Sequence, residues 1–341
     1  MQGALNLEYL HADEVAGYLK ENEGHVLGLV AFGSHLEGHY RALRPSPLWA
    51  HIPVLGLGLD TVHNYPGTSF EVWSSAYPVS SYVQGNISAA ADGTVLFGSL
   101  QMDQIEGTTF GALVKQAYLE IFSFMERQGY RHLLRTWNYF PDITGTEDGL
   151  ERYRCFNLGR HEAYAATGRD TAMEGVPAAS VLGSREGPLL IYFLAGMRPG
   201  HAIENPRQVN PHRYPDQYGP RSPTFVRAML ATFGRQQCLA ISGTASIVGY
   251  ETMHPGDVDK QAQETLLNIR TLLKQVPALD QGGGRMLLKV YLRHAADLER
   301  VRNQVKREFG TNHKAVYLLS DICRTDLLME IEGVCFGRVE G

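Results

Sequence analysis

Apolar residues return at helical spacing after Asp257. Within residues 257–276, valine, alanine, leucine and isoleucine recur every three or four positions, which places them along one side of a helix. Asp257 follows a Pro-Gly pair, and its carboxylate is suited to cap the first turn. The pattern predicts an amphipathic helix that packs one side on an apolar core.

The segments after this helix alternate between strand and helix patterns. A glycine run at 282–284 precedes a strand rather than a helix, so it is interpreted as a connection and not as a phosphate-binding loop. The expected elements are a strand at 285–293, a helix at 295–310 that ends at a glycine, and strands at 314–320 and 327–335. The order is therefore helix, strand, helix, strand, strand.

The middle of the chain shows the same order. Expected there are a helix at 110–129, a strand at 131–140, a helix at 148–168 and strands at 177–183 and 188–196. Short strands come before each first helix, at 25–33 and 94–100 in the first half and at 237–243 in the second. We interpret this as an internal duplication rather than a chance order. The prediction is an α/β (α+β) fold of two similar α-β domains, in mixed sheets with helices packed on one face.

The segment that joins the two halves has an unusual composition. Residues 198–227 hold six prolines, which exclude a long helix, and five arginines against two acidic residues, a local charge of +3. Solvated linkers are usually rich in small or charged residues, whereas this segment carries three aromatic ones. A binding loop is favoured over a linker. The expected domains are 1–197 and 235–341, with the loop at 198–234 between them.

Composition restricts the kind of partner. The 341 residues are 44% hydrophobic and carry a net charge of -5, which suits a globular protein with sizeable cores. No basic face is indicated, so a nucleic-acid partner is not expected. A negatively charged ligand would need a local cluster of arginines.

Cysteine and histidine spacing argues against metals and disulfides. The four cysteines show no CxxC pair, and the thirteen histidines are scattered. The first residues lack the basic start of a signal peptide, and no apolar stretch approaches the roughly 18 residues of a membrane span. The expectation is a cytoplasmic protein with no metal site and no membrane partner.

The last predicted strand carries two carboxylates on one face. In LLMEIEG, Glu330 and Glu332 alternate with Met329 and Ile331, so the glutamates share a side. If that side faces water, the glutamates have no special role. If a carboxyl is buried beside apolar walls, its pKa rises and it can act as a general acid near neutral pH. Both interpretations stay open at this point.

Other residues suggest a site without establishing one. Arg152 and Arg160 lie eight apart in one predicted helix, either on a solvated face or toward a ligand. Arg135 lies within a predicted strand, where a free arginine is less common, which suggests a partner. Cys323 has polar neighbours, so it suits a turn at the rim of a site, although a lone cysteine is usually a small core residue.

The second half resembles the reactive-intermediate deaminase (Rid) fold. Shared features are the strand ending in Ser242-Gly243, the glycine before an amphipathic helix that contains Gln263 and Asn268, and the final EIE. The arginine that this family carries before its penultimate strand is not evident. The resemblance covers about a third of the chain, and the missing arginine argues against simple imine hydrolysis.

A longer stretch resembles the chorismatase family. The similarity runs from Trp137 to Cys335 through WNYFPDI, ERYRCFNLGR, IENPRQVNPHRYPDQYGPRSPTF, ISGTASIVGYET and DICRTDLLMEIEG. The resemblance implies an enzyme that uses neither metal nor cofactor, takes chorismate as its substrate and releases pyruvate. Rid proteins are trimers, and a chain with two such halves has less need to self-associate, so a monomer is expected.

The same resemblance assigns catalytic roles. Glu330 is the implied general acid, which protonates the methylene carbon of the enol ether. An oxocarbenium ion then reacts with a nucleophile and pyruvate departs. A cysteine at position 323 accompanies the members that form 3-hydroxybenzoate, with 4-hydroxybenzoate as a second product to consider. A chorismate hydrolase that forms a dihydroxycyclohexadiene carboxylate, a Rid-like imine hydrolase and a non-catalytic metabolite sensor remain alternatives.

Substrate-binding residues follow from the family-like stretches. Chorismate carries two carboxylates, and arginine binds planar carboxylates with two parallel hydrogen bonds. The expected binders of carboxylate and hydroxyl groups are Arg154, Arg160, Arg207, Arg213, Tyr214, Tyr218 and Arg221. Gly243 and Ala245 are expected to let the backbone approach the ring.

Overall fold

The computed structural model describes residues 4–33, 49–59, 68–169, 175–280 and 284–338. Most of the predicted glycine connection at 282–284 therefore lies outside the described residues. The described strands form three larger sheets and two short hairpins. None of the described helices combines the length and the apolar character needed to cross a membrane.

Two sheets of seven strands form the centre of the molecule. In the first, the order is β21 (Asp321–Ile322), β12 (Ala178–Ser184), β9 (His132–Pro141), β13 (Leu189–Gly196), β8 (Val95–Met102), β7 (Ile87–Ala91) and β6 (Ser80–Gln84). In the second, it is β14 (His201–Ile203), β15 (Ala228–Phe233), β16 (Gln236–Thr244), β22 (Met329–Arg338), β19 (Arg285–Leu292), β20 (His313–Leu319) and β4 (Leu55–Leu59).

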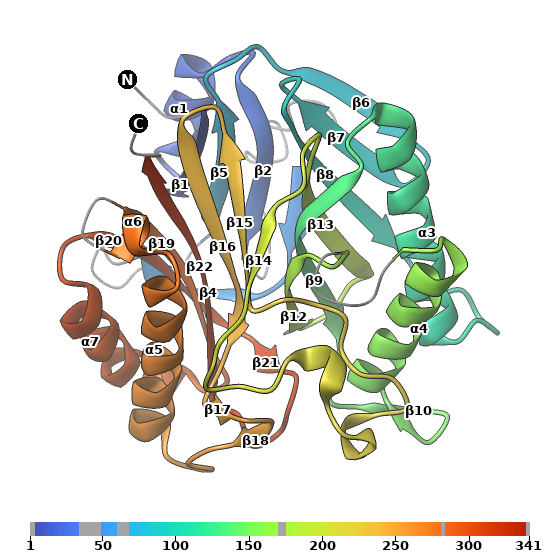
Figure 1. The fold of residues 1–341 in the computed structure, drawn as a ribbon, viewed down its shortest axis with the longest axis vertical. Helices are drawn as coiled ribbons and strands as arrows, with labels where there is room; N and C mark the ends of the chain where they lie inside the picture. Colours follow the sequence, from blue (N-terminus) through green and yellow to red (C-terminus); the bar gives the residue numbers. More distant parts are fainter. Residues whose placement is uncertain (1–3, 34–48, 60–67, 170–174, 281–283, 339–341) are drawn as a thin grey trace.

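Helices cover the outer face of each large sheet. Figure 1 shows α3 (Phe110–Gln128) and α4 (Arg152–Ala166) on one side of the molecule and α5 (Val258–Lys274) and α7 (Leu298–Phe309) on the other, with the strands between them. As predicted, Asp257 caps α5, because its side chain accepts a hydrogen bond from the Lys260 N–H. The short α6 (Pro277–Asp280) follows α5. The mixed α/β fold is thus confirmed.

The predicted repetition is present in the strand pairing. In the first sheet, β9 is parallel to β12 and antiparallel to β13, which in turn pairs with β8. In the second, β19 is parallel to β20 and antiparallel to β22, which pairs with β16. The single parallel pair therefore occupies the same place in both sheets.

A third sheet repeats this pairing, and the sequence did not reveal it. The order is β1 (Leu5–His11), β5 (Ser69–Ser75), β2 (Val26–Phe32) and β3 (Trp49–Ile52), with β2 parallel to β3 and antiparallel to β5. Helix α1 (Val15–Glu21) lies between β1 and β2 in the chain and buries only Val15, so its helical pattern is weak. The copies also exchange strands, since β4 joins the second large sheet and β21 joins the first.

Several predicted boundaries shift by a few residues. The expected helix at 148–168 begins at Arg152, because the residues before it form a hairpin of β10 (Thr146–Glu147) and β11 (Leu150–Glu151). The expected helix at 295–310 begins with a 3-10 turn, η3 (Ala295–Asp297). The connecting segment contains η1 (Pro211–Arg213), η2 (Asp216–Tyr218) and the edge strand β14, in keeping with its prolines. A second hairpin pairs β17 (Ile247–Val248) with β18 (Glu251–Thr252).

The inner faces of the three sheets meet in one core. Trp73 of β5 lies 5.9 Å from Trp137 of β9, measured between ring centroids. The hydroxyls of Tyr139 on β9 and Tyr291 on β19 are 2.6 Å apart. These two tyrosines hold equivalent positions in their sheets, so this hydrogen bond joins like positions of the two copies.

Charged groups are buried where the three sheets meet. Lys289 Nζ donates to Glu71 Oε2 at 2.6 Å and lies 2.7 Å from Glu332 Oε1. Arg135 Nη2 donates to Glu332 Oε2 at 2.7 Å. We refer to Glu71, Arg135, Lys289 and Glu332 as the buried charge cluster. It contains two cations and two carboxylates, and each of its side chains is at most 3% exposed.

Removing one cation from this cluster should destabilise the fold. Lys289→Met leaves two carboxylates short of a buried partner, and we expect the free energy of unfolding to fall by about 3–5 kcal/mol. Urea denaturation measures this change. Lys260→Met is the matched control, because Lys260 is 61% exposed in its pair with Asp257 and such a pair contributes about 0–1 kcal/mol. An equal loss of free energy of unfolding in the two variants would contradict a stabilising role of the buried charge cluster.

Candidate active site

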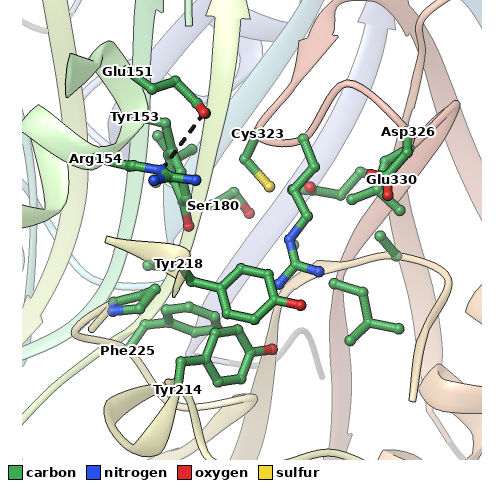
Figure 2. Close-up of a pocket in the computed structure, with 18 of the residues that line it drawn as sticks. Glu151, Tyr153, Arg154, Ser180, Tyr214, Tyr218, Phe225, Cys323, Asp326 and Glu330 are labelled. Atoms are coloured by element: carbon green, nitrogen blue, oxygen red, sulfur yellow. Dashed lines mark ion pairs between the residues drawn. The ribbon is translucent and has the colours of Figure 1, made fainter. Parts of the chain in front are cut away.

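A pocket of about 310 Å³ lies between the first and second large sheets. Its walls come from the start of α4, from β12, from the connecting segment, from β16 and from the loop that leads into β22. Figure 2 shows these side chains arranged around one space. The residues that line it are Glu151, Tyr153, Arg154, Ala179, Ser180, Val181, Tyr214, Tyr218, Pro223, Phe225, Arg227, Gly243, Ala245, Ile247, Cys323, Arg324, Thr325, Asp326, Leu327 and Glu330.

Glu330 is the buried carboxyl of this pocket. Its side of β22 faces the first sheet and the pocket, and the residue is 5% exposed. Burial, together with the nearby Glu332 carboxylate, raises the pKa of Glu330 to about 8, against the opposing influence of Arg135. Of the two interpretations of the paired glutamates, the buried one holds. A pKa raised in this way favours the protonated form of the Glu330 carboxyl at neutral pH.

Gly243 makes room for this carboxyl. A Cβ added to Gly243 would lie 1.9 Å from Glu330 Oε1, far inside any allowed contact. The small residue in the SGTASIVG run is therefore required by the position of the acid. Ala245, two residues along, also lines the pocket.

Glu332 shares the strand face but has a different environment. Its two oxygens accept hydrogen bonds from Arg135 Nη2 and Trp137 Nε1, both at 2.7 Å. Burial alone would raise the pKa of Glu332, but Lys289 and Arg135 hold it below its ordinary value. Two glutamates two residues apart thus have opposite shifts, because one has cationic partners and the other does not.

Cys323 lies beside the acid in the loop after β21. Figure 2 shows its thiol directed into the pocket. Burial, and next the Glu330 carboxyl, raise the pKa of the Cys323 thiol to about 12. The thiol is therefore neutral at physiological pH, and it presents a weakly polar surface next to Glu330 rather than a thiolate.

Three arginines also line the pocket. Arg324 lies over the Tyr218 ring at 4.3 Å and donates to the Tyr250 carbonyl at 2.9 Å. Arg227 donates to the Tyr214 hydroxyl at 2.8 Å. Arg154 forms a loose ion pair with Glu151, with 3.7 Å between nitrogen and oxygen. The pocket thus combines one carboxyl of raised pKa with three guanidinium groups.

The structure brings most of the predicted site residues together. Those that line the pocket are Arg154, Tyr214, Tyr218, Gly243, Ala245, Cys323 and Glu330. Four predicted arginines lie outside the described lining. Arg160 is buried on α4 over the Tyr118 ring, at 5.1 Å, and Arg207 is bonded to Glu264 and Asn268 of α5. Arg213 and Arg221 are exposed on the connecting segment.

Two lining arginines were missed from the sequence. Arg227 ends the arginine-rich connecting segment, and Arg324 follows the cysteine in DICRTD, so both lay inside stretches already singled out. Nothing in the local pattern distinguishes them from their neighbours. Arg135, expected to have a partner, forms an ion pair with Glu332. The described residues contain no group of three or more His, Cys, Asp or Glu side chains that could hold a metal ion.

Comparison with known proteins adds independent evidence. Residues 71–195 match the family model of the N-terminal region of FkbO/Hyg5-like chorismatases. The chain is 36% identical to a 3-hydroxybenzoate synthase of Streptomyces hygroscopicus over 277 residues, which cover 77% of this chain and 80% of that protein. It is 39% identical to a chorismatase of Streptomyces rapamycinicus over 279 residues, which cover 77% and 81%.

A solved structure gives the same answer for the fold. The crystal structure of a chorismatase superposes with a TM-score of 0.82 and 29% sequence identity, over 97% of this chain and 98% of that one. The similarity in sequence and in structure therefore extends well beyond the pocket. This chain is an enzyme that belongs to the chorismatase family.

Proposed function

We propose that this enzyme cleaves the enolpyruvyl ether of chorismate and releases pyruvate and 3-hydroxybenzoate. The observation that carries the proposal is the buried Glu330 carboxyl, whose pKa burial raises to about 8 and which faces a pocket lined by arginines. The names of the relatives point to the same substrate and product. All atoms of chorismate are accounted for by these two products, so the overall reaction requires no further reactant.

The first step is a proton transfer to carbon. Glu330 donates its proton to the methylene carbon of the enol ether, and positive charge develops on the ether carbon as an oxocarbenium ion. Protonation of carbon is slow, so the acid must be held against the methylene group with its proton in place. The absence of a side chain at Gly243 leaves the space that the carboxyl occupies.

Arginines hold the two carboxylates of the substrate. Arg154, Arg227 and Arg324 line the pocket, and their guanidinium groups suit planar carboxylates. Tyr214 and Tyr218 stack near two of these arginines and orient them. Arg207 instead fastens the connecting segment to α5. In this proposal Arg160, Arg213 and Arg221 support the loop and helix around the pocket rather than contact the ring.

Cys323 directs the second step. Hydrolysis needs a water molecule held beside the cationic carbon, which would give pyruvate and a dihydroxycyclohexadiene carboxylate. A neutral thiol is a weak hydrogen-bonding group and anchors water poorly. With Cys323 next to Glu330, an intramolecular route that ends in the aromatic 3-hydroxybenzoate is favoured, with 4-hydroxybenzoate as a minor product.

We also propose that the enzyme acts as a monomer. The three sheets of one chain enclose a shared core, and the pocket is lined by elements of the same chain. No second copy is needed to supply a residue to the site as it is described.

Loss of the acid should remove the activity. Glu330→Gln retains the shape of the side chain but cannot donate the proton, so we expect kcat to fall by about 10²–10⁴-fold. Pyruvate release from chorismate, without added metal or cofactor, measures this. In the unaltered enzyme, kcat/KM should decline as pH rises through about 8, because Glu330 then loses its proton. Unchanged activity in Glu330→Gln would exclude this residue as the acid.

Replacement of the cysteine should change the product instead of the rate. Cys323→Ala opens space for water beside Glu330, and we expect the ratio of dihydroxycyclohexadiene carboxylate to 3-hydroxybenzoate to rise about tenfold, which corresponds to roughly 1.4 kcal/mol between the two routes. Chromatography of the products measures the ratio. Cys238→Ala, at a buried cysteine outside the pocket lining, is the control. The same product ratio in both variants would contradict the role of Cys323.

A further inference from the structure

The buried charge cluster lies directly behind the acid. Glu330 and Glu332 are neighbours on one face of β22, and Arg135 is close enough to act on both electrostatically. Arg135 nevertheless directs Nη2 to Ser180 Oγ at 2.6 Å and to Glu332 Oε2 at 2.7 Å. Among the described residues, none forms a hydrogen bond or ion pair with the Glu330 carboxyl. The cation that opposes the raised pKa of Glu330 is thus bonded to the other glutamate.

Arg135 has unused hydrogen-bonding capacity. Its Nε and Nη1 atoms are buried and have no hydrogen-bond partner among the described residues. A buried guanidinium with free N–H groups would readily form an ion pair with a nearby carboxylate. The two positive charges of the cluster are matched by Glu71 and Glu332. No positive charge of the cluster is therefore left for Glu330.

We propose that Glu332 is a positioning residue for catalysis: by holding Arg135 and Lys289 on its own carboxylate, it prevents an ion pair between Arg135 and Glu330, so that Glu330 meets the substrate with its proton. This inference rests on the proposed role of Glu330 as the acid. It assigns to the cluster a function in the reaction in addition to its contribution to stability.

The other groups around Glu330 do not supply the missing cation. Tyr153 of α4 and Cys323 have pKa values raised, first by burial, and are neutral. Glu151 and Asp326 are acidic, and burial raises the pKa of Glu151. The cations that line the same pocket are Arg154, Arg227 and Arg324. Two of these hold fixed hydrogen bonds to tyrosine or backbone oxygens, and the third pairs with Glu151.

The effect of each substitution has a definite sign. Glu332→Gln removes a like charge and releases two cations, so the pKa of Glu330 should fall toward that of an ordinary glutamate. Arg135→Gln removes the opposing cation, so the pKa of Glu330 should rise further above 8. A role confined to packing would lower activity in both variants without moving their pH profiles in opposite directions.

The experiment is the pH profile of kcat/KM for chorismate, measured on the full chain. For Glu332→Gln we expect the alkaline limb to move at least one pH unit lower, with about tenfold lower activity at pH 8 and recovery of activity at pH 5.5. For Arg135→Gln we expect the limb to move higher. Glu332→Asp, which keeps the charge, should restore the original limb. Unmoved limbs, or limbs that move in the same direction, would overturn the inference.

Two further arms keep the test decisive. The double variant Glu332→Gln/Lys289→Met keeps the charge of the cluster balanced, and it should show the same downward shift if the single variant does not fold. If neither variant folds, the shift of the alkaline limb to higher pH in Arg135→Gln tests the inference. Carbon-13 NMR of labelled glutamate follows the Glu330 carboxyl without any substrate. An enzyme that leaves chorismate intact but shows these titration shifts would refute the proposed function and retain the electrostatic role of Glu332.

Discussion

The structure depends on how three sheets share a small number of buried charges. Glu71, Arg135, Lys289 and Glu332 come from different strands of the three sheets, and isolated burial of any one of them would cost several kcal/mol. Each sheet therefore stabilises groups that another sheet contributes. We propose that the same arrangement adds to the effect of burial on the pKa of Glu330, because the cations that neutralise Glu332 form no ion pair with Glu330. In this proposal the buried charge cluster contributes both to stability and to the protonation of Glu330.

The repeated fold explains where the site lies and why the two large sheets differ. Tyr139 pairs with Leu190 in the first large sheet, and Tyr291 pairs with Glu330 in the second. Leu190 thus holds the position equivalent to that of the acid, and only the second sheet can supply a proton there. The first sheet contributes Ser180 to the pocket wall, and the start of α4, which covers that sheet, contributes Tyr153 and Arg154. The two copies therefore contribute different residues to the same pocket.

Local patterns predicted the elements better than their contacts. The apolar stripe after Asp257 and the alternation around Glu330 follow from helical and strand geometry, and the structure agrees with both. The local pattern left open which glutamate reaches the pocket, because Arg135, which pairs with Glu332, is 197 residues away in the chain, and only the family resemblance singled out Glu330. The third sheet escaped detection since its helix buries a single residue. Arg227 and Arg324 lack any local signal that separates a pocket arginine from a structural one.

The most direct measurement of the central claim is the infrared spectrum of the Glu330 carboxyl. A protonated carboxyl in a buried site absorbs as a C=O stretch that is well separated from the carboxylate bands. We expect such a band from the unaltered enzyme at pH 7. It should be absent from Glu330→Gln, and it should be lost as the pH rises through about 8. A carboxylate at position 330 at pH 7, with no protonated band to lose, would contradict the claim that this buried acid meets its substrate with a proton.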